Sequence, residues 1–243
     1  MSGPAGLLTR AGGPRAARPV ATADDLQIAG LTRLSTCDWP GRLVATVFLQ
    51  GCPLACGYCH NPGLLDPRTP GTVAWRAVRD LLARRAGMLD GVVFSGGEPT
   101  AQAGLGSAMR EVRAARFGVG LHTAGAYPRR FAEVLPLCDW VGLDLKAPAH
   151  RYEAVTGVRG GADHAFACLD LAIASGVDLQ VRTTVDPTVL LPDDVAALTA
   201  DLRARGVREH VLQEVRTQGT RPEYVARLAQ FRAGRSGAVA SPA

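Results

Sequence analysis

The sequence predicts an α/β fold with parallel strands inside and helices outside. From about residue 43, short apolar runs typical of strands alternate with helical patterns six times. The connections have ordinary crossover lengths, and this alternation builds a parallel sheet with helices packed on it. Six such units form either an open sheet or an incomplete barrel, and periodicity alone does not choose between these architectures.

The individual elements follow from apolar periodicity and turn residues. The runs "LQIAGLTRL" and "LVATVFL" predict two strands joined by the turn "DWPG". Thr72 is predicted to cap a helix whose apolar side chains recur at helical spacing, namely Val73, Ala77, Val78, Leu81 and Leu82. The later strands are predicted at "GVVFSGG", "VGLHT", "WVGLDLK", "DLQVRTTV" and "EHVLQEV". The later helices are predicted at 100–117, 128–137, 163–175, 193–205 and 222–232.

The chain ends differ from its body. Residues 1–22 are rich in Gly, Pro, Ala and Arg without apolar periodicity, which predicts a disordered leader before a single domain at 23–243. A transit peptide is the alternative reading of this arginine-rich, acid-free stretch, whereas a signal peptide would need a continuous apolar segment. No run reaches the roughly 18 apolar residues of a membrane helix. We therefore expect a cytoplasmic protein without membrane contact.

The positive charge is weak support for a nucleic-acid partner. The formal net charge is +5, and three arginines of the leader contribute to it without any acid. Without the leader the body is nearly balanced, and its arginines alternate along helices as on a solvated face. We therefore predict that the chain does not bind nucleic acid.

Polar groups follow each predicted parallel strand, where chemistry gathers in such folds. The first strand ends in "GCPLACGYCHNP" (51–62), which carries Cys52, Cys56 and Cys59. The next five strands end in "SGGEPT", "HTAG", "DLK", "VRTTV" and "LQEVR". Loops after strands are commonly polar, but three thiols and a Gly-Gly-Glu sequence exceed that expectation.

The cysteine spacing favours an iron–sulfur cluster. Three disulfides among the six cysteines are a poor fit, because half of the cysteines lie in one loop of a large chain. Zinc is the other alternative, with His60 completing a Cys3His set, although the adjacent Cys59 would have to share that ion. A cluster normally takes four thiolates, so three leave one iron open for a cofactor.

Two further motifs bear on the same site. In "SGGEPT" (95–100) the glycines let the backbone approach a ligand, and the carboxylate of Glu98 suits an ammonium group. Lys146 in "DLK" is the one lysine among 27 basic residues. Its compact ammonium differs from the arginine fork, which suggests a specific role. Asp144 and Lys146 alternate on a strand and share a face.

Together these motifs resemble those of the radical S-adenosylmethionine (SAM) enzymes. "CPLACGYC" is similar to their Cys-x3-Cys-x2-Cys loop, and "GGEPT" to their Gly-Gly-Glu motif. Within that superfamily, "DWPGRLVATVFLQGCPLACGYCHNP", "VVFSGGEPT", "GLDLKAP" and "YEAVTG" resemble the anaerobic ribonucleoside-triphosphate reductase activating proteins and pyruvate formate-lyase activase. The resemblance implies an incomplete (β/α)6 barrel and spans most of residues 26–216.

The resemblance also implies roles for individual residues. Cys52, Cys56 and Cys59 would hold a [4Fe-4S] cluster whose open iron binds the amino and carboxylate groups of SAM. The remaining cofactor-binding residues would be Tyr58, Gly96, Gly97, Glu98, Thr123, Asp144, Lys146 and Arg182. No catalytic residue beyond cluster and cofactor is implied, and no second cluster, so Cys37, Cys138 and Cys168 are expected to be packed or incidental thiols.

The implied reaction is the generation of a glycyl radical on a partner enzyme. A one-electron donor such as flavodoxin or ferredoxin would reduce the cluster, SAM would be cleaved, and the resulting radical would take hydrogen from a glycine. The partner implied is an anaerobic ribonucleotide reductase. The alternatives are another glycyl-radical enzyme of the pyruvate formate-lyase type, a small-molecule radical SAM reaction such as 7-carboxy-7-deazaguanine synthesis, and, outside enzymes, a zinc-binding module.

One stretch departs from the family pattern. The third parallel strand ends in His122-Thr123-Ala124-Gly125, where pyruvate formate-lyase activase has an Asp-Thr-Asn-Gly type stretch. Whether His122 contacts the cofactor is left open by the sequence.

Overall fold

A computed structural model describes residues 20–238, with side chains to residue 234. Its seven strands form one sheet in the order β1 to β7. The strands are β1 (Ile28–Ser35), β2 (Val44–Leu49), β3 (Gly91–Gly96), β4 (Gly118–Thr123), β5 (Trp140–Asp144), β6 (Asp178–Val185) and β7 (Glu209–Glu214). β1 is antiparallel to β2, and every later pair is parallel. The sheet is open, because β7 is hydrogen-bonded to β6 alone among the described strands.

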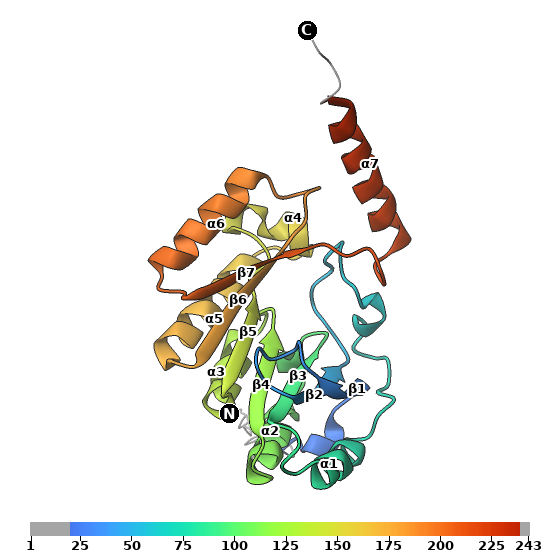
Figure 1. Cartoon of the computed structure of the whole chain (residues 1–243), viewed down its shortest axis with the longest axis vertical. Coiled ribbons are helices and arrows are strands. Elements are labelled where there is room, and N and C mark those ends of the chain that lie inside the picture. The colour runs from blue at the N-terminus through green and yellow to red at the C-terminus, as the bar shows by residue number, and fades with distance from the viewer. Residues whose placement is uncertain (1–19, 239–243) are drawn as a thin grey trace, which may run out of the picture.

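Helices connect the parallel strands and lie along the outer side of the curved sheet (Figure 1). The α-helices are α1 (Trp75–Arg84), α2 (Leu105–Ala114), α3 (Pro128–Val134), α4 (Tyr152–Thr156), α5 (Gly161–Ser175), α6 (Pro192–Ala204) and α7 (Pro222–Ala238). The predicted (β/α)6 arrangement is thus confirmed, with six parallel strands each followed by a helix. Among the described residues, no helix has the length and apolar character to cross a membrane.

Several predicted boundaries were wrong. Thr72 does not cap a helix, because its backbone N–H and that of Val73 donate to Ile28 and its hydroxyl donates to the carbonyl of Ala29. α1 begins at Trp75 with Ala74 at its N-cap, two residues after the predicted cap. The helix predicted at 100–117 begins at Leu105, after a short 3-10 turn at Pro99–Ala101. The turn at Ala149–Arg151 and helix α4 behind β5 were not predicted.

Most of the predicted leader lies outside the described residues. At its end, Thr22 pairs with Asp25 through its backbone N–H at 2.7 Å and its hydroxyl at 2.9 Å. The carbonyl of Ala21 accepts from Ser107 on α2. Contacts with the body therefore begin before residue 23.

Two tryptophans fill the amino-terminal end of the barrel. The rings of Trp39 and Trp140 stack with centroids 5.7 Å apart, and both are buried. Gly120 lies beside them, and a Cβ there would meet Trp39 at 3.0 Å and Val93 at 2.9 Å. Side chains thus fill the interior of the barrel at this end.

Candidate active site

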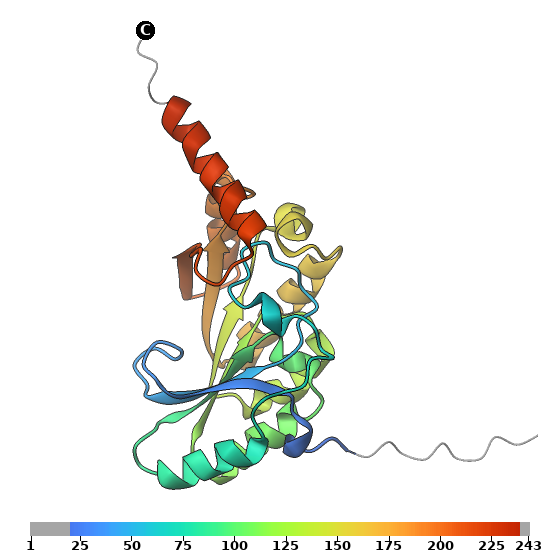
Figure 2. The ribbon, with the colours of Figure 1, turned by 90° about the vertical axis from the view of Figure 1, so that its right-hand side faces the viewer.

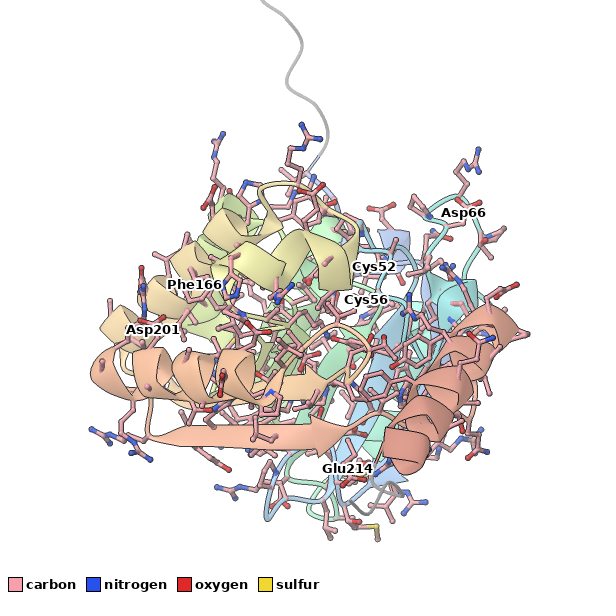
Figure 3. The ribbon with its side chains drawn as sticks, turned by 90° about the horizontal axis from the view of Figure 1, so that it is seen from above. Cys52, Cys56, Asp66, Phe166, Asp201 and Glu214 are labelled. Atoms are coloured by element: carbon pink, nitrogen blue, oxygen red, sulfur yellow. The ribbon has the colours of Figure 1, made fainter. Side chains whose placement is uncertain are left out.

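A cavity of about 250 Å³ lies at the carboxyl ends of the parallel strands. Small-molecule sites are commonly about 300–1,000 Å³, so the volume of this cavity lies just below that range. Ten of the eleven predicted site residues line it, namely Cys52, Cys56, Tyr58, Cys59, Gly96, Gly97, Thr123, Asp144, Lys146 and Arg182. Figure 3 looks down on the molecule and shows Cys52 and Cys56 near its middle.

Backbone hydrogen bonds anchor the cysteine loop. The N–H of Gly51 donates to Leu64 at 2.8 Å, and that of Cys52 donates to Leu65 at 3.1 Å. The N–H of Ala55 donates to the carbonyl of Thr156 on α4 at 2.8 Å. The three thiols are thereby presented to one cavity by a loop held on both sides.

The three thiols have the chemistry of cluster ligands. All are free, with Cys56 buried and Cys52 and Cys59 half-buried. Burial raises the pKa of Cys52 to about 12, and it also raises the pKa of Cys56, which the Lys146 ammonium partly offsets. Metal ligation requires deprotonated thiols, so binding of a positively charged iron core would release these protons.

Gly96 and Gly97 allow the end of β3 to pass directly under the cysteine loop. A Cβ at Gly96 would lie 2.4 Å from the backbone nitrogen of Leu49, and Gly96 has φ +111°. A Cβ at Gly97 would lie 2.3 Å from the carbonyl oxygen of Gly51. Both positions need glycine because a side chain would displace the backbone that carries the thiols.

Glu98 is the one predicted site residue that does not line the cavity. Its side chain is fully buried. Oε1 accepts from the N–H of Thr100 at 3.1 Å and from the hydroxyls of Thr100 and Thr123, each at 2.7 Å. Oε2 accepts from the N–H of Ala124 at 2.8 Å. This carboxylate therefore ties the end of β3 to the end of β4.

Replacing Glu98 with alanine is expected to lower the free energy of unfolding by about 3 kcal/mol, because it leaves buried donors on two strand ends unsatisfied. Equilibrium denaturant unfolding of the iron-free chain measures this loss. Glu133→Ala, at an exposed glutamate of α3, is the control and should change stability by less than about 0.5 kcal/mol. Equal stability of the two variants would contradict the structural role of Glu98.

Asp144 joins two cations at the wall of the cavity. Its Oδ2 accepts from Nζ of Lys146 at 3.0 Å, and its Oδ1 accepts from Nε of Arg182 at 2.8 Å. Burial works against the charge of Asp144, but Lys146 and Arg182 outweigh it and hold the pKa of Asp144 below its usual range. Nζ of Lys146 also lies 5.9 Å from the centre of the Tyr58 ring. The cavity wall thus carries one anion and two cations within hydrogen-bond reach.

His122, whose contact with a cofactor the sequence left open, also lines the cavity. Its Nε2 lies 2.7 Å from the carbonyl oxygen of Asp38 and 3.2 Å from a guanidinium nitrogen of Arg182, and its Nδ1 lies 3.3 Å from the hydroxyl of Ser95. Burial and the Arg182 charge lower the pKa of His122 to about 4. Other lining residues that the sequence did not single out include Ser95, Thr184 and Gln213.

The low pKa of His122 predicts a pH-dependent stability. An unfolded histidine has a pKa near 6.5, so the unfolded chain binds a proton between about pH 6.5 and 4 while the folded chain does not. This histidine therefore destabilises the fold as the pH falls through that window, by up to about 1.4 kcal/mol per pH unit. In His122→Gln, the free energy of unfolding should fall less steeply as the pH is lowered. Denaturant unfolding of the iron-free chain at several pH values measures this. An unchanged dependence of the free energy of unfolding on pH would contradict the assignment of a neutral, half-buried histidine.

The open α/β barrel, with thiols and charged groups around one cavity at its carboxyl end, has the architecture of a cofactor-dependent barrel enzyme. The family model "Radical SAM superfamily" matches residues 46–202. The chain belongs to the radical SAM superfamily, whose enzymes use a [4Fe-4S] cluster and SAM.

Two curated proteins are similar over most of the chain. A protein of Methanocaldococcus jannaschii, named as a candidate glycyl-radical enzyme activating enzyme, is 29% identical over 175 residues, covering 69% of this chain and 72% of its own. The pyruvate formate-lyase-activating enzyme of Clostridium pasteurianum is 29% identical over 171 residues, covering 67% and 70%.

Solved structures agree in fold. Streptococcus suis SuiB bound to precursor peptide SuiA aligns with a TM-score of 0.57 and 14% identity over 76% of this chain. SuiB bound to S-adenosylmethionine aligns with a TM-score of 0.54 and 15% identity over 79%. The alignments cover 43% and 46% of the SuiB chains, so this chain spans less than half of their length.

Proposed function

We propose that this chain generates a glycyl radical on a partner enzyme. The observation that carries the proposal is the convergence of Cys52, Cys56 and Cys59 with the Asp144–Lys146–Arg182 group on one cavity. The names of the curated relatives support the choice of reaction within the superfamily.

The three loop cysteines are the proposed cluster ligands. They fit the group because they are free thiols on one well-anchored loop and all face one cavity. Three thiolates leave one iron of a four-iron cluster without a protein ligand, where SAM can bind. A cluster held by these three cysteines would supply one electron for the reductive cleavage of SAM, which would be the source of the radical that takes hydrogen from the glycine.

The remaining residues orient SAM and fix its charges. The backbone at Gly96 and Gly97 would admit the methionine end of SAM, and Lys146 or Arg182 would face its carboxylate. Tyr58 would lie beside the adenine, and Thr123 holds the turn after β3 by donating its hydroxyl to Glu98. Glu98 acts indirectly, since its carboxylate is already occupied by buried donors. No general base is needed for hydrogen-atom transfer.

The proposed partner is an anaerobic ribonucleoside-triphosphate reductase, on the strength of the motif resemblance. The open edge of the sheet leaves β7 exposed next to the cavity, with Leu212 50% exposed and Gln213 at the cavity wall. A peptide loop carrying a glycine has access along such an edge. A flavodoxin or ferredoxin is the proposed electron donor, and the cytoplasm remains the predicted location.

Anaerobic incubation with candidate partners tests the proposal. The reconstituted chain is mixed with dithionite, SAM and either a reductase or a pyruvate formate-lyase, and glycyl radical is measured by electron paramagnetic resonance (EPR). We expect a radical on the reductase in amounts that match the 5′-deoxyadenosine formed. A radical on the lyase alone would overturn the choice of partner. SAM cleavage with neither protein radicalised, but with a small molecule consumed, would overturn glycyl-radical activation.

A further inference from the structure

The C-terminal segment packs on the cysteine loop although it lies outside the residues that match the family. The match ends at residue 202, whereas α7 begins at Pro222. Figures 1 and 2 show α7 standing out from the barrel, with its first turns against the rest of the chain. Tyr224 and Leu228 are 3% and 1% exposed, so these turns are firmly packed.

Gly57, between Cys56 and Tyr58, is the point of closest approach. A Cβ at Gly57 would lie 2.7 Å from a guanidinium nitrogen of Arg227 and 3.2 Å from the ring of Tyr224. The Tyr224 ring also meets the Tyr58 ring edge to face, with centroids 6.5 Å apart. α7 therefore covers the loop at the two residues that separate Cys56 from Cys59.

The same turns also contact the end of β6, through Arg227 and Asp186. Asp186 follows β6 and is 1% exposed, and its carboxylate lies 3.7 Å from Arg227. The Arg227 guanidinium also lies 5.0 Å from the centre of the Tyr224 ring. Burial raises the pKa of Tyr224, and the Asp186 carboxylate raises it further. Arg227 thus links the first turns of α7 to the end of β6, while Tyr224 packs on the cysteine loop.

We propose that Tyr224 is a positioning residue for the cluster loop. It does not line the cavity and acts through Tyr58 and the Gly57 backbone, which it holds so that Cys56 and Cys59 face the cavity. Arg227 closes over Gly57 and assists. The proposal rests on the cysteine loop being the cluster site and is independent of which substrate receives the radical.

Thiol labelling of the iron-free chain tests the position of the loop without any activity. A small alkylating agent is applied under native conditions, and the rate at each cysteine is read by peptide mass spectrometry. Cys168, fully buried in α5, reports global unfolding in the same sample. In Tyr224→Ala we expect the Cys56 rate to rise about ten-fold relative to the Cys168 rate, because local opening is easier than global unfolding.

Three further variants test whether loss of the Tyr224 ring causes the faster labelling of Cys56. Tyr224→Phe keeps the ring and should label like the unmodified chain. Gln230→Ala, at an exposed position of α7, should also be unchanged. Arg227→Ala removes a side chain that is 52% exposed and should raise the Cys56 rate about three-fold. The proposal would be overturned if Tyr224→Ala raised the labelling rates of Cys56 and Cys168 equally while Arg227→Ala changed neither rate. It would also be overturned if neither variant raised the Cys56 rate.

A second readout uses the loaded protein. Tyr224→Ala should alter the EPR spectrum of the reduced cluster with SAM and raise the KM for SAM about ten-fold. Tyr224→Phe should have the spectrum and the KM of the unmodified chain. An unaltered spectrum and KM in Tyr224→Ala would overturn the positioning role. If loop opening is measured but no partner accepts a radical, the proposed function fails while this inference stands.

Discussion

Cys56→Ala is expected to lose cluster assembly and SAM cleavage together. Cys56 is the most buried of the three loop thiols, and its removal leaves two ligands for a group that needs three from the protein. Iron and sulfide content after anaerobic reconstitution should fall to background, and 5′-deoxyadenosine formation should drop by at least about 10³-fold, as expected when the group that carries the chemistry is absent.

Cys37→Ala is the matched control for this prediction. Cys37 is exposed and lies outside the cavity, so its removal should leave iron content and SAM cleavage unchanged. Retained SAM cleavage in Cys56→Ala would overturn the assignment of the loop cysteines. Loss in both variants would point to a general effect of removing thiols and would equally contradict it.

Lys146→Ala is expected to impair SAM use while the cluster still assembles. Lys146 is 13% exposed at its side chain and pairs with Asp144, so its removal leaves Asp144 with Arg182 alone and takes one cation from the cavity wall. One charge-assisted hydrogen bond contributes about 2 kcal/mol, so kcat/KM for SAM should fall about 30-fold. Iron content and SAM-dependent turnover measure the two effects separately.

Lys146→Arg sharpens this test. It keeps the charge, but the wider guanidinium fork does not reproduce the position of a single ammonium 3.0 Å from Asp144. We expect kcat/KM between those of the unmodified chain and Lys146→Ala. Unchanged SAM affinity and turnover in Lys146→Ala would remove this residue from the site.

Much of the fold and the composition of the cavity wall could be predicted from the sequence, because both depend on local patterns. Parallel strands carry continuous apolar runs, and their carboxyl ends meet at one edge, so residues far apart in the sequence, such as Asp144 and Arg182 at a separation of 38, were expected together. Asp144, Lys146 and Arg182 illustrate this, since β5 and β6 pair Asp144 directly with Arg182. The Cys-x3-Cys-x2-Cys spacing alone, without any tertiary information, indicated that this loop is the candidate cluster-binding loop.

What the sequence did not predict depends on long-range contacts. Thr72 resembles a helix cap, but its bonds with Ile28 and Ala29 outweigh the local preference. The sequence predicts that Glu98 faces a ligand. In the structure its carboxylate points into the interior, where it accepts four hydrogen bonds from Thr100 and from the end of β4. Nothing in the pattern of α7 indicates that Tyr224 lies on Gly57. Apolar periodicity and turn residues report on neighbouring positions, so they do not indicate which distant segments come into contact.

The central claim is that the three loop cysteines hold a four-iron cluster with an iron open to SAM. EPR of the anaerobically reconstituted, dithionite-reduced chain, recorded with and without SAM, tests it most directly. The account predicts the signal of a reduced [4Fe-4S] cluster that changes shape when SAM is added. A silent spectrum from protein that contains about one zinc per chain would contradict it and would make the cysteine loop a structural site.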